Sequence, residues 1–219
     1  MKKESFGNTD DREKTRQLSP AEQRRLLQFE ALSEAMLQQG YRRTELTISV
    51  VKANIFAVVL LIPLAILGLG LFLVKNNGFH GSFAAGSYLL FLVVFAVLIV
   101  VHELIHGVCW AIFAEHHMKD IEFGFMKQYL TPYCTCRVPL TRNQYILGGV
   151  MPLIVLGVVP MIAGILAGSL PTLLLGIIMA DAAAGDIMVI RNILRYKSRA
   201  ESVVYIDHPT QAGGVIFEK

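Results

Sequence analysis

His102-Glu103-Leu104-Ile105-His106 lies in the second half of an apolar run that extends from residue 84 to residue 114. Glu103 is the one charged residue of that run. The run exceeds the roughly 20 apolar residues that a helix needs to cross the hydrocarbon core of a bilayer. The sequence therefore predicts a membrane-spanning helix with a carboxylate and two imidazoles in its second half.

The spacing of these three residues is typical of a metal site. Residues four apart lie one turn above each other on a helix, so His102 and His106 would direct two imidazoles at one point. Glu103 lies about 100° around the helix and can reach a water held there. This is the H-E-x-x-H pattern, in which the imidazoles bind zinc and the carboxylate is a general base. On a soluble helix the same residues could form a solvated face, but ionisable groups inside membrane helices are usually functional, so the metal site is favoured.

The composition is that of an integral membrane protein. Of 219 residues, 54% are hydrophobic and 17% are charged, which is too apolar for an ordinary soluble domain. The formal net charge of +3 is small, so nucleic acid is not an expected partner. The three cysteines do not form a disulfide framework, and the Cys134-x-Cys136 pair is interpreted as packed thiols.

The expected fold is mainly α, with about four transmembrane helices, a small cytoplasmic β-hairpin and an N-terminal amphipathic helix. The four spans are expected at residues 50–74, from 84 to about 114, 145–167 and 172–190. Ser19-Pro20-Ala21-Glu22 predicts the capped start of the amphipathic helix, which would pack on the protein or lie on the membrane surface. Short strands are expected at 44–50, at 121–126 with 133–138 as a hairpin, and in the tail at 202–209.

This pattern divides the chain into four segments. They are a disordered tail (1–18), an amphipathic helix and strand (19–49), a four-helix transmembrane domain with a hairpin loop at 115–143 (50–194), and a C-terminal strand and tail (195–219). Lys and Arg are concentrated in the N-terminal segment, in the loop after the second span and in the tail. The positive-inside rule then places both termini in the cytoplasm, and the second and fourth spans run from outside to inside.

A third metal ligand is expected from another span at the same depth, because catalytic zinc has three protein ligands and an open position. Besides Glu103, the acidic residues within the expected spans are Asp181 and Asp186, both in the fourth. Asp186 lies late in that span, at the depth of His102 and His106, and is the expected ligand. Asp181 is the second choice, or a residue that orients a ligand imidazole. For either carboxylate the alternative is a hydrogen bond to a neighbouring helix.

These residues predict a hydrolytic mechanism with one zinc ion per chain. Zinc lowers the pKa of a water, Glu103 accepts its proton, and Glu103 then passes the proton to the leaving amine. Arg142, Asn143 and Gln144 are candidate oxyanion donors. The hairpin lies on the side of the motif, so its edge could receive an extended substrate by strand addition.

Several stretches resemble the zincin peptidases, a family of small bacterial membrane proteins. They are His102-Glu103-Leu104-Ile105-His106-Gly107, Tyr133-Cys134-Thr135-Cys136, Pro139-Leu140-Thr141-Arg142-Asn143-Gln144-Tyr145, Gly185-Asp186-Ile187 and Asp207-His208-Pro209. The resemblance covers roughly residues 45–217. A more distant resemblance to site-2 proteases implies an intramembrane zinc endopeptidase with an aspartate as third ligand. Together they imply a multi-pass protein of the bacterial inner membrane that cleaves membrane proteins or peptides.

Other functions remain open from the sequence. A non-catalytic metal-binding regulator or scaffold is the main alternative, although binding alone would not need Glu103. A di-iron membrane hydroxylase needs more histidines than the six present. A transporter is disfavoured because the spans show no repeated halves. The expected partners are the lipid bilayer and a membrane protein or peptide substrate, and the sequence leaves the oligomeric state open.

Overall fold

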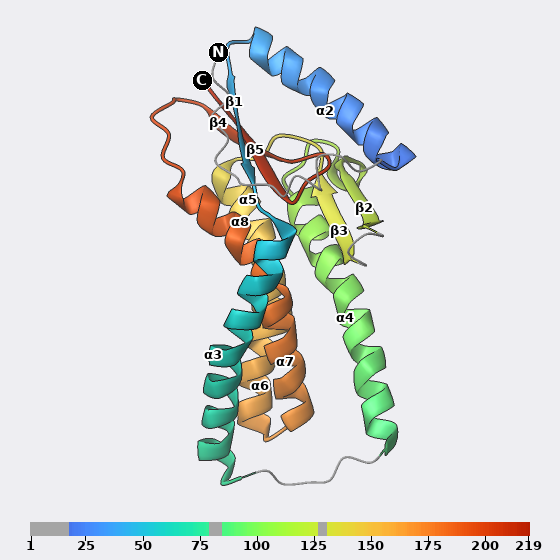
Figure 1. The fold of residues 1–219 in the computed structure, drawn as a ribbon, viewed down its shortest axis with the longest axis vertical. Helices are drawn as coiled ribbons and strands as arrows, with labels where there is room; N and C mark the ends of the chain where they lie inside the picture. The colour runs from blue at the N-terminus through green and yellow to red at the C-terminus, as the bar shows by residue number, and fades with distance from the viewer. Residues whose placement is uncertain (1–17, 79–84, 127–130) are drawn as a thin grey trace.

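The computed structural model describes residues 18–78, 85–126 and 131–219. The disordered tail expected at 1–18 lies outside the described residues, apart from Leu18. The protein is mainly helical, and its long helices extend from a smaller part that contains two β-sheets (Figure 1).

Among the described residues, three helices are long and apolar enough to cross a membrane, and a bent pair could supply a fourth span. The three are α3 (Val50–Asn76), α4 (Ala85–Ala111, counted from Tyr88 as a span) and a helix at Arg142–Ala167. The last consists of α5 (Arg142–Pro152), the π-helical segment η2 (Leu153–Val158) and α6 (Val159–Ala167). The bent pair is α7 (Leu170–Ala182) and α8 (Ala184–Arg195).

The exposed surface of these helices is apolar. On α3 the buried residues are Gly68 and Phe72, while side chains such as Ile55 and Ile66 are exposed. A water-soluble protein would rarely leave so large an apolar surface uncovered. This surface is the one that a bilayer would cover.

Helix α7 packs closely against η2 and α6, because each of these two segments has a glycine at the contact. A Cβ atom added to Gly157 would lie 2.8 Å from the Cβ of Ala180, and Gly164 similarly faces Leu173. On the other side of α7, Gly68 of α3 leaves room for Ile177. Contacts through small residues allow the backbones of membrane helices to approach.

The fourth expected span is not a straight helix. The axes of α7 and α8 differ by 46°, with the break at Ala183 (φ −78°, ψ 8°). The break falls in the run 182–185, which consists of three alanines and a glycine. Because these side chains are small, the bend brings the start of α8 close to neighbouring helices without bulky side chains in the way. From the sequence, a single span was expected at 172–190, without a bend.

A three-stranded antiparallel sheet lies beyond the helices, in the order β1-β5-β4. Its strands are β1 (Arg42–Thr47), β4 (Val203–Asp207) and β5 (Gly213–Glu218). The sequence predicted strands near β1 and β4 but not β5, which is the central strand. Ile216 pairs with Thr44 on one side and with Tyr205 on the other. The segments 19–49 and 195–219 therefore contribute to one sheet.

Helix α2 (Pro20–Gln38) covers one face of this sheet (Figure 1). Ser19 and Glu22 form the reciprocal capping box that the sequence indicates. Phe29 and Met36 then pack against a cluster of side chains from the sheet, Ile206, Val215 and Phe217. The buried face of α2 is thus directed at the protein.

The second sheet is the expected hairpin, formed by β2 (Ile121–Met126) and β3 (Thr131–Cys136). It follows the short helix η1 (His117–Asp120). Side chains of β2 lie against α4 at Gly107, where an added Cβ would meet Phe123 and Ile121. A glycine at this position lets the hairpin sit directly on the motif helix.

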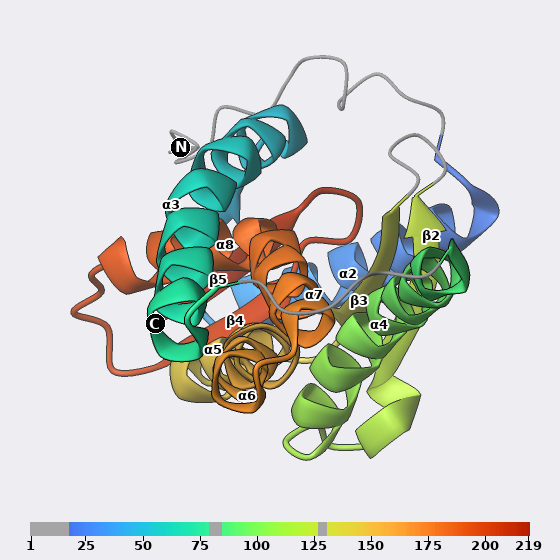
Figure 2. The same cartoon turned by 90° about the horizontal axis from the view of Figure 1, so that it is seen from below.

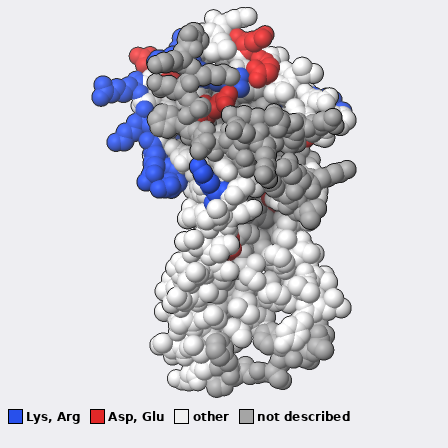
Figure 3. Space-filling model, in the orientation of Figure 1, with Lys and Arg blue, Asp and Glu red and all other residues white. Residues whose placement is uncertain are grey.

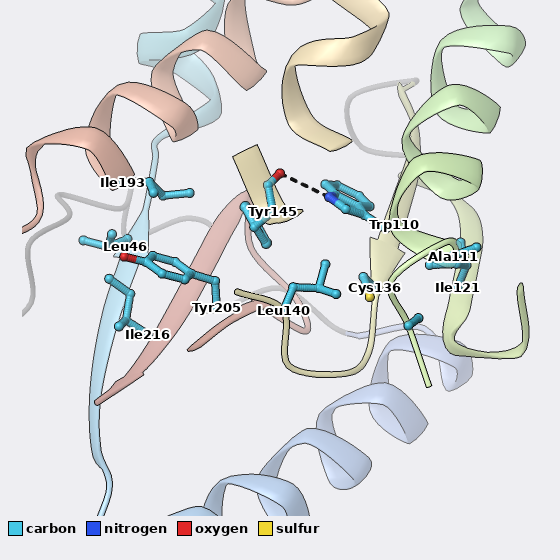
Figure 4. Close-up of a cluster of buried hydrophobic side chains, with 11 residues drawn as sticks. Leu46, Trp110, Ala111, Ile121, Cys136, Leu140, Tyr145, Ile193, Tyr205 and Ile216 are labelled. Atoms are coloured by element: carbon cyan, nitrogen blue, oxygen red, sulfur yellow. Dashed lines mark hydrogen bonds between the residues drawn. The ribbon is translucent and has the colours of Figure 1, made fainter. Parts of the chain in front are cut away.

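A buried cluster joins the helices to both sheets (Figure 4). Trp110 of α4 lies beside Tyr145 of α5, and its indole N–H donates to the Tyr145 carbonyl at 3.2 Å. Leu140 and Tyr205 exchange main-chain hydrogen bonds next to them. This core fixes the end of α4 that carries the metal-binding motif.

Candidate metal centre

The structure brings the two motif histidines together with Asp186. His102 Nε2 lies 3.2 Å from His106 Nε2 and 3.2 Å from Asp186 Oδ2. His106 Nε2 lies 3.4 Å from the same carboxylate oxygen. The histidines come from adjacent turns of α4, and Asp186 comes from the first turn of α8, just after the bend. Both histidines are buried.

Hydrogen bonds and stacking orient the His106 ring. Its Nδ1–H donates a hydrogen bond to the Gly148 carbonyl of α5 at 2.9 Å. The lone pair of Nε2 is then available to bind a metal ion. The ring stacks on Trp110 with centroids 5.1 Å apart. Added Cβ atoms at Gly148 would collide with the indole, so a glycine is needed there. By contrast, His102 Nδ1 is buried and has no hydrogen-bond partner among the described residues.

These three donor atoms fit a zinc ion. Tetrahedral zinc with ligand bonds of about 2.0–2.1 Å separates its ligand atoms by about 3.3 Å. The observed separations are 3.2, 3.2 and 3.4 Å. Two imidazole nitrogens and one carboxylate oxygen are also ligands that zinc takes in catalytic sites. His102, His106 and Asp186, which all line the adjoining cavity, would therefore hold the metal.

Glu103 lies at the edge of the same site. Its carboxylate accepts a hydrogen bond from the main-chain N–H of Cys134, in β3. Glu103 also lines the cavity that His102 and His106 line. The hairpin thus holds the expected general base beside the ligand cluster.

Asp181 does not join the cluster. It lies at the end of α7, before the bend, and it does not line the cavity. One of its carboxylate oxygens is buried without a hydrogen-bond partner in the described part of the chain. Of the two aspartates considered from the sequence, the geometry brings Asp186 to the histidines.

The cavity beside the donors has a volume of about 270 Å³. Its walls come from α4, α8, β3, the start of α2 and the loop between β4 and β5. Gly185, Val189 and Ile190 contribute apolar lining from α8, and Thr131 and Thr135 contribute polar groups from β3. A cavity of this size is near the lower limit of small-molecule sites and accommodates a short stretch of extended peptide.

Arg25 of α2 lines this cavity and connects several of the elements around it. Its Nε–H donates to the Pro209 carbonyl at 2.6 Å, and Nη1 donates to Glu122 at 2.7 Å and to the Tyr133 hydroxyl at 2.8 Å. The guanidinium also lies over the Tyr133 ring. Since Arg25 is almost fully buried, these contacts fix α2 against the hairpin and the β4–β5 loop.

Asp207 is a further carboxylate in the cavity wall, and its side chain is half-buried. It accepts hydrogen bonds from the Tyr145 hydroxyl and, at 2.7 Å, from the Cys136 main-chain N–H. The main-chain N–H groups of Cys134 and Cys136 thus donate hydrogen bonds to the carboxylates of Glu103 and Asp207, respectively. Strand addition along this edge of β3 would have to compete with these two hydrogen bonds.

The cysteines of β3 behave as packed thiols. Burial raises the pKa of both, in the case of Cys136 to about 12. Thiols with a raised pKa are poor nucleophiles and poor metal ligands at neutral pH.

The suggested oxyanion donors were wrong. Arg142 donates to the carbonyls of Ile193 and Leu194, and Gln144 accepts from the Thr141 N–H as part of a helix cap. Asn143 is exposed and, like the other two, does not line the cavity.

The sequence analysis also missed the supporting residues, Arg25, Trp110, Tyr145, Gly148 and Asp207. For Trp110 a signal existed, because it follows His106 by four residues and so shares its helix face. For the others, only the three-dimensional contacts reveal the role.

Asp207 and His208 should give opposite pH dependences of stability. Burial raises the pKa of Asp207 to about 6, so the folded protein holds a proton that the unfolded chain loses near pH 4, and stability falls as pH rises through this window. Burial lowers the pKa of His208 to about 4, and its Nδ1 accepts from the N–H groups of Thr210 and Gln211, so stability rises from pH 4 to about 6.5. Each group changes the free energy of unfolding by up to about 3 kcal/mol, and the two changes largely cancel because their signs are opposite.

We therefore expect the stability of the parent to change little with pH in this range. A variant that lacks one of the two groups should show the pH dependence caused by the other. The unfolding temperature of Asp207→Asn should rise between pH 4.5 and 6, and that of His208→Asn should fall. Thermal unfolding in one detergent at several pH values measures both. Parallel curves for the two variants would contradict the assignment.

A comparison with known protein families gave a match over part of the chain. Residues 95–200 match the model of the family described as "Putative zincin peptidase". The matched region includes His102, Glu103, His106 and Asp186. Neither the curated proteins nor the solved structures gave a match. Over residues 95–200, just under half of its length, the chain is thus similar to the "Putative zincin peptidase" family.

Proposed function

We propose that this chain is an integral membrane zinc metallopeptidase that hydrolyses peptide bonds in membrane or membrane-proximal proteins, with Glu103 as general base. The observation that carries the proposal is the convergence of His102, His106 and Asp186 on one point, beside Glu103 and a peptide-sized cavity. The similarity to the family and the apolar helices support the general class, a membrane metallopeptidase.

Each residue of the site has a distinct task. Bound zinc supplies a Lewis acid that polarises a carbonyl and acidifies water. His102, His106 and Asp186 would hold the ion, and Gly148 and Trp110 keep the His106 ring in place. Glu103 removes a proton from the attacking water and delivers it to the amine nitrogen as the peptide bond breaks. The Cys134 N–H holds the Glu103 carboxylate for both transfers.

The position of the site supports a substrate from the membrane. No side chain of α4 between Tyr88 and Val101 is buried within the described part of the chain. Figures 1 and 2 show this half of α4 standing apart from α3 and α6. His102 follows directly on the same helix. A protein segment between these helices could thus reach the site from the apolar layer.

We place the helices in the inner membrane of a bacterium, and the charges support an orientation with both termini in the cytoplasm. Figure 3 shows Lys and Arg on the part that carries the sheets, and below it a white surface with only a small red patch. Lys75 is the cation at the opposite end of α3. The positive-inside rule assigns the cation-rich end to the cytoplasm.

Removal of zinc tests the proposed function. The purified protein should contain about one zinc per chain and cleave at least one of a set of co-expressed membrane proteins. A chelator should abolish cleavage, and zinc should restore it. Zinc binding without chelator-sensitive cleavage of any membrane protein tested would instead indicate a metal-binding regulator. A protein that binds no zinc would contradict the proposal outright.

A further inference from the structure

A row of exposed cations follows the bend between α7 and α8. It consists of Arg191, Arg195, Lys197 and Arg199, and we call it the α8 cation row. Glu201 is the acidic residue of the segment 191–201, so three net positive charges remain. Within the described residues, none of the four cations forms an ion pair. A row of unpaired cations on a protein surface is suited to an anionic partner.

This row lies where the apolar helices end. Helix α8 packs against α3 and α5. Arg142, the first residue of α5, donates to the carbonyls of Ile193 and Leu194 at 3.3 and 3.2 Å. The cation row is therefore level with the ends of two membrane-spanning helices. Figure 3 shows Lys and Arg side chains gathered at this height, directly above the uncharged half of the molecule.

The form of α8 also fits a membrane surface. Its axis is turned by 46° from that of α7. Leu194, which is 55% exposed, lies between Arg191 and Arg195, while the neighbouring Ile193 is buried in the core. A helix with exposed cations beside an exposed apolar side chain is suited to the layer of lipid headgroups.

We propose that the α8 cation row binds the phosphate groups of anionic phospholipids in the cytoplasmic leaflet. Clusters of four or more Lys and Arg immediately after a membrane helix attract anionic lipid, and each cation strengthens the association about fivefold. The lipid would also hold the helix that carries Asp186, five residues before Arg191. The binding itself does not depend on the proposed peptidase function.

Lipid titration of the purified full-length protein tests this inference. Phosphatidylglycerol, phosphatidylcholine and inorganic phosphate are added separately in a neutral detergent, and the unfolding temperature and the lipids retained in native mass spectrometry are measured. Phosphatidylglycerol should raise the unfolding temperature and remain bound, while the other two should not. An equal effect of inorganic phosphate would overturn the lipid assignment.

Paired substitutions locate the binding. The double variants Arg191→Gln with Arg195→Gln, and Lys197→Gln with Arg199→Gln, should each weaken phosphatidylglycerol binding by tenfold or more. The control pair, Arg24→Gln with Lys119→Gln, removes two exposed cations from α2 and η1 and should leave binding within twofold. Equal losses in all three variants would overturn the inference, because diffuse charge would then explain the binding. The unfolding temperature without lipid verifies that each variant folds. Because Lys197 and Arg199 follow the end of α8, the second pair tests the binding without a change in that helix.

Discussion

The Glu103→Gln variant retains zinc and loses peptide-bond hydrolysis by a factor of roughly 10²–10⁴, the usual contribution of a general base. Glutamine keeps the size of the side chain and can still accept the hydrogen bond from the Cys134 N–H. Its amide cannot take a proton from water. Metal binding should be unaffected because Glu103 is not among the three converging donors. Zinc content and single-substrate cleavage rates measure the two properties separately.

A matched substitution makes this result specific. Glu115 lies twelve residues further along the chain, just after α4, and is exposed. Glu115→Gln removes the same charge and should cleave at the parental rate. Cleavage by Glu103→Gln within tenfold of the parent would exclude Glu103 as the base.

The second large effect is loss of zinc in Asp186→Ala. Asp186 supplies the oxygen that lies 3.2 Å from His102 Nε2 and 3.4 Å from His106 Nε2. Even residues that only orient a ligand change metal affinity by about 10–100-fold, so loss of a ligand should exceed this range. We expect zinc affinity to fall by more than 100-fold, and competition with a chromogenic chelator measures it.

Asp181→Ala is the control for this experiment. It removes the same functional group from the same bent helix pair, five residues earlier and outside the donor cluster. Zinc affinity should stay within a few-fold of the parent. The reverse outcome, with zinc lost from Asp181→Ala and kept by Asp186→Ala, would move the third ligand to Asp181.

The apolar runs predicted the membrane helices well, because hydrophobic length is a strong local signal. The expected spans at 50–74 and 145–167 correspond to α3 (Val50–Asn76) and to the helix at Arg142–Ala167. The bend at Ala183 was not predictable from such a signal. Alanine favours a straight helix, and here packing around the site overrides that preference.

Strand β5 shows a different limit of the sequence. Its first residues, Gly213 and Gly214, indicate a turn rather than a strand. Gly213 has a φ of +114°, which other residues rarely adopt, and it lies close to the β1 backbone. Only the pairing with both β1 and β4 makes this segment the centre of a sheet.

At the site, depth within the membrane was sufficient to favour Asp186 over Asp181, and the structure places Asp186 beside the histidines. Arg142 and Gln144 were suggested as oxyanion donors, but both side chains cap helices instead. Gln144 caps the start of α5, and Arg142 binds a carbonyl at the end of α8. The contacts of Gly148 and Asp207 join segments far apart in the chain, and no periodicity within one segment reveals them.

The central place of β5 sets an order of events during synthesis. Strand β1 leaves the ribosome about 170 residues before its partner, which at roughly 5–20 residues per second is a wait on the order of 10–30 s. All the membrane helices are made in that interval. The cavity wall at 207–213 can close only after β5 has paired with β1 and β4. A nascent chain that has already made His102, His106 and Asp186 would therefore still lack a finished cavity beside them.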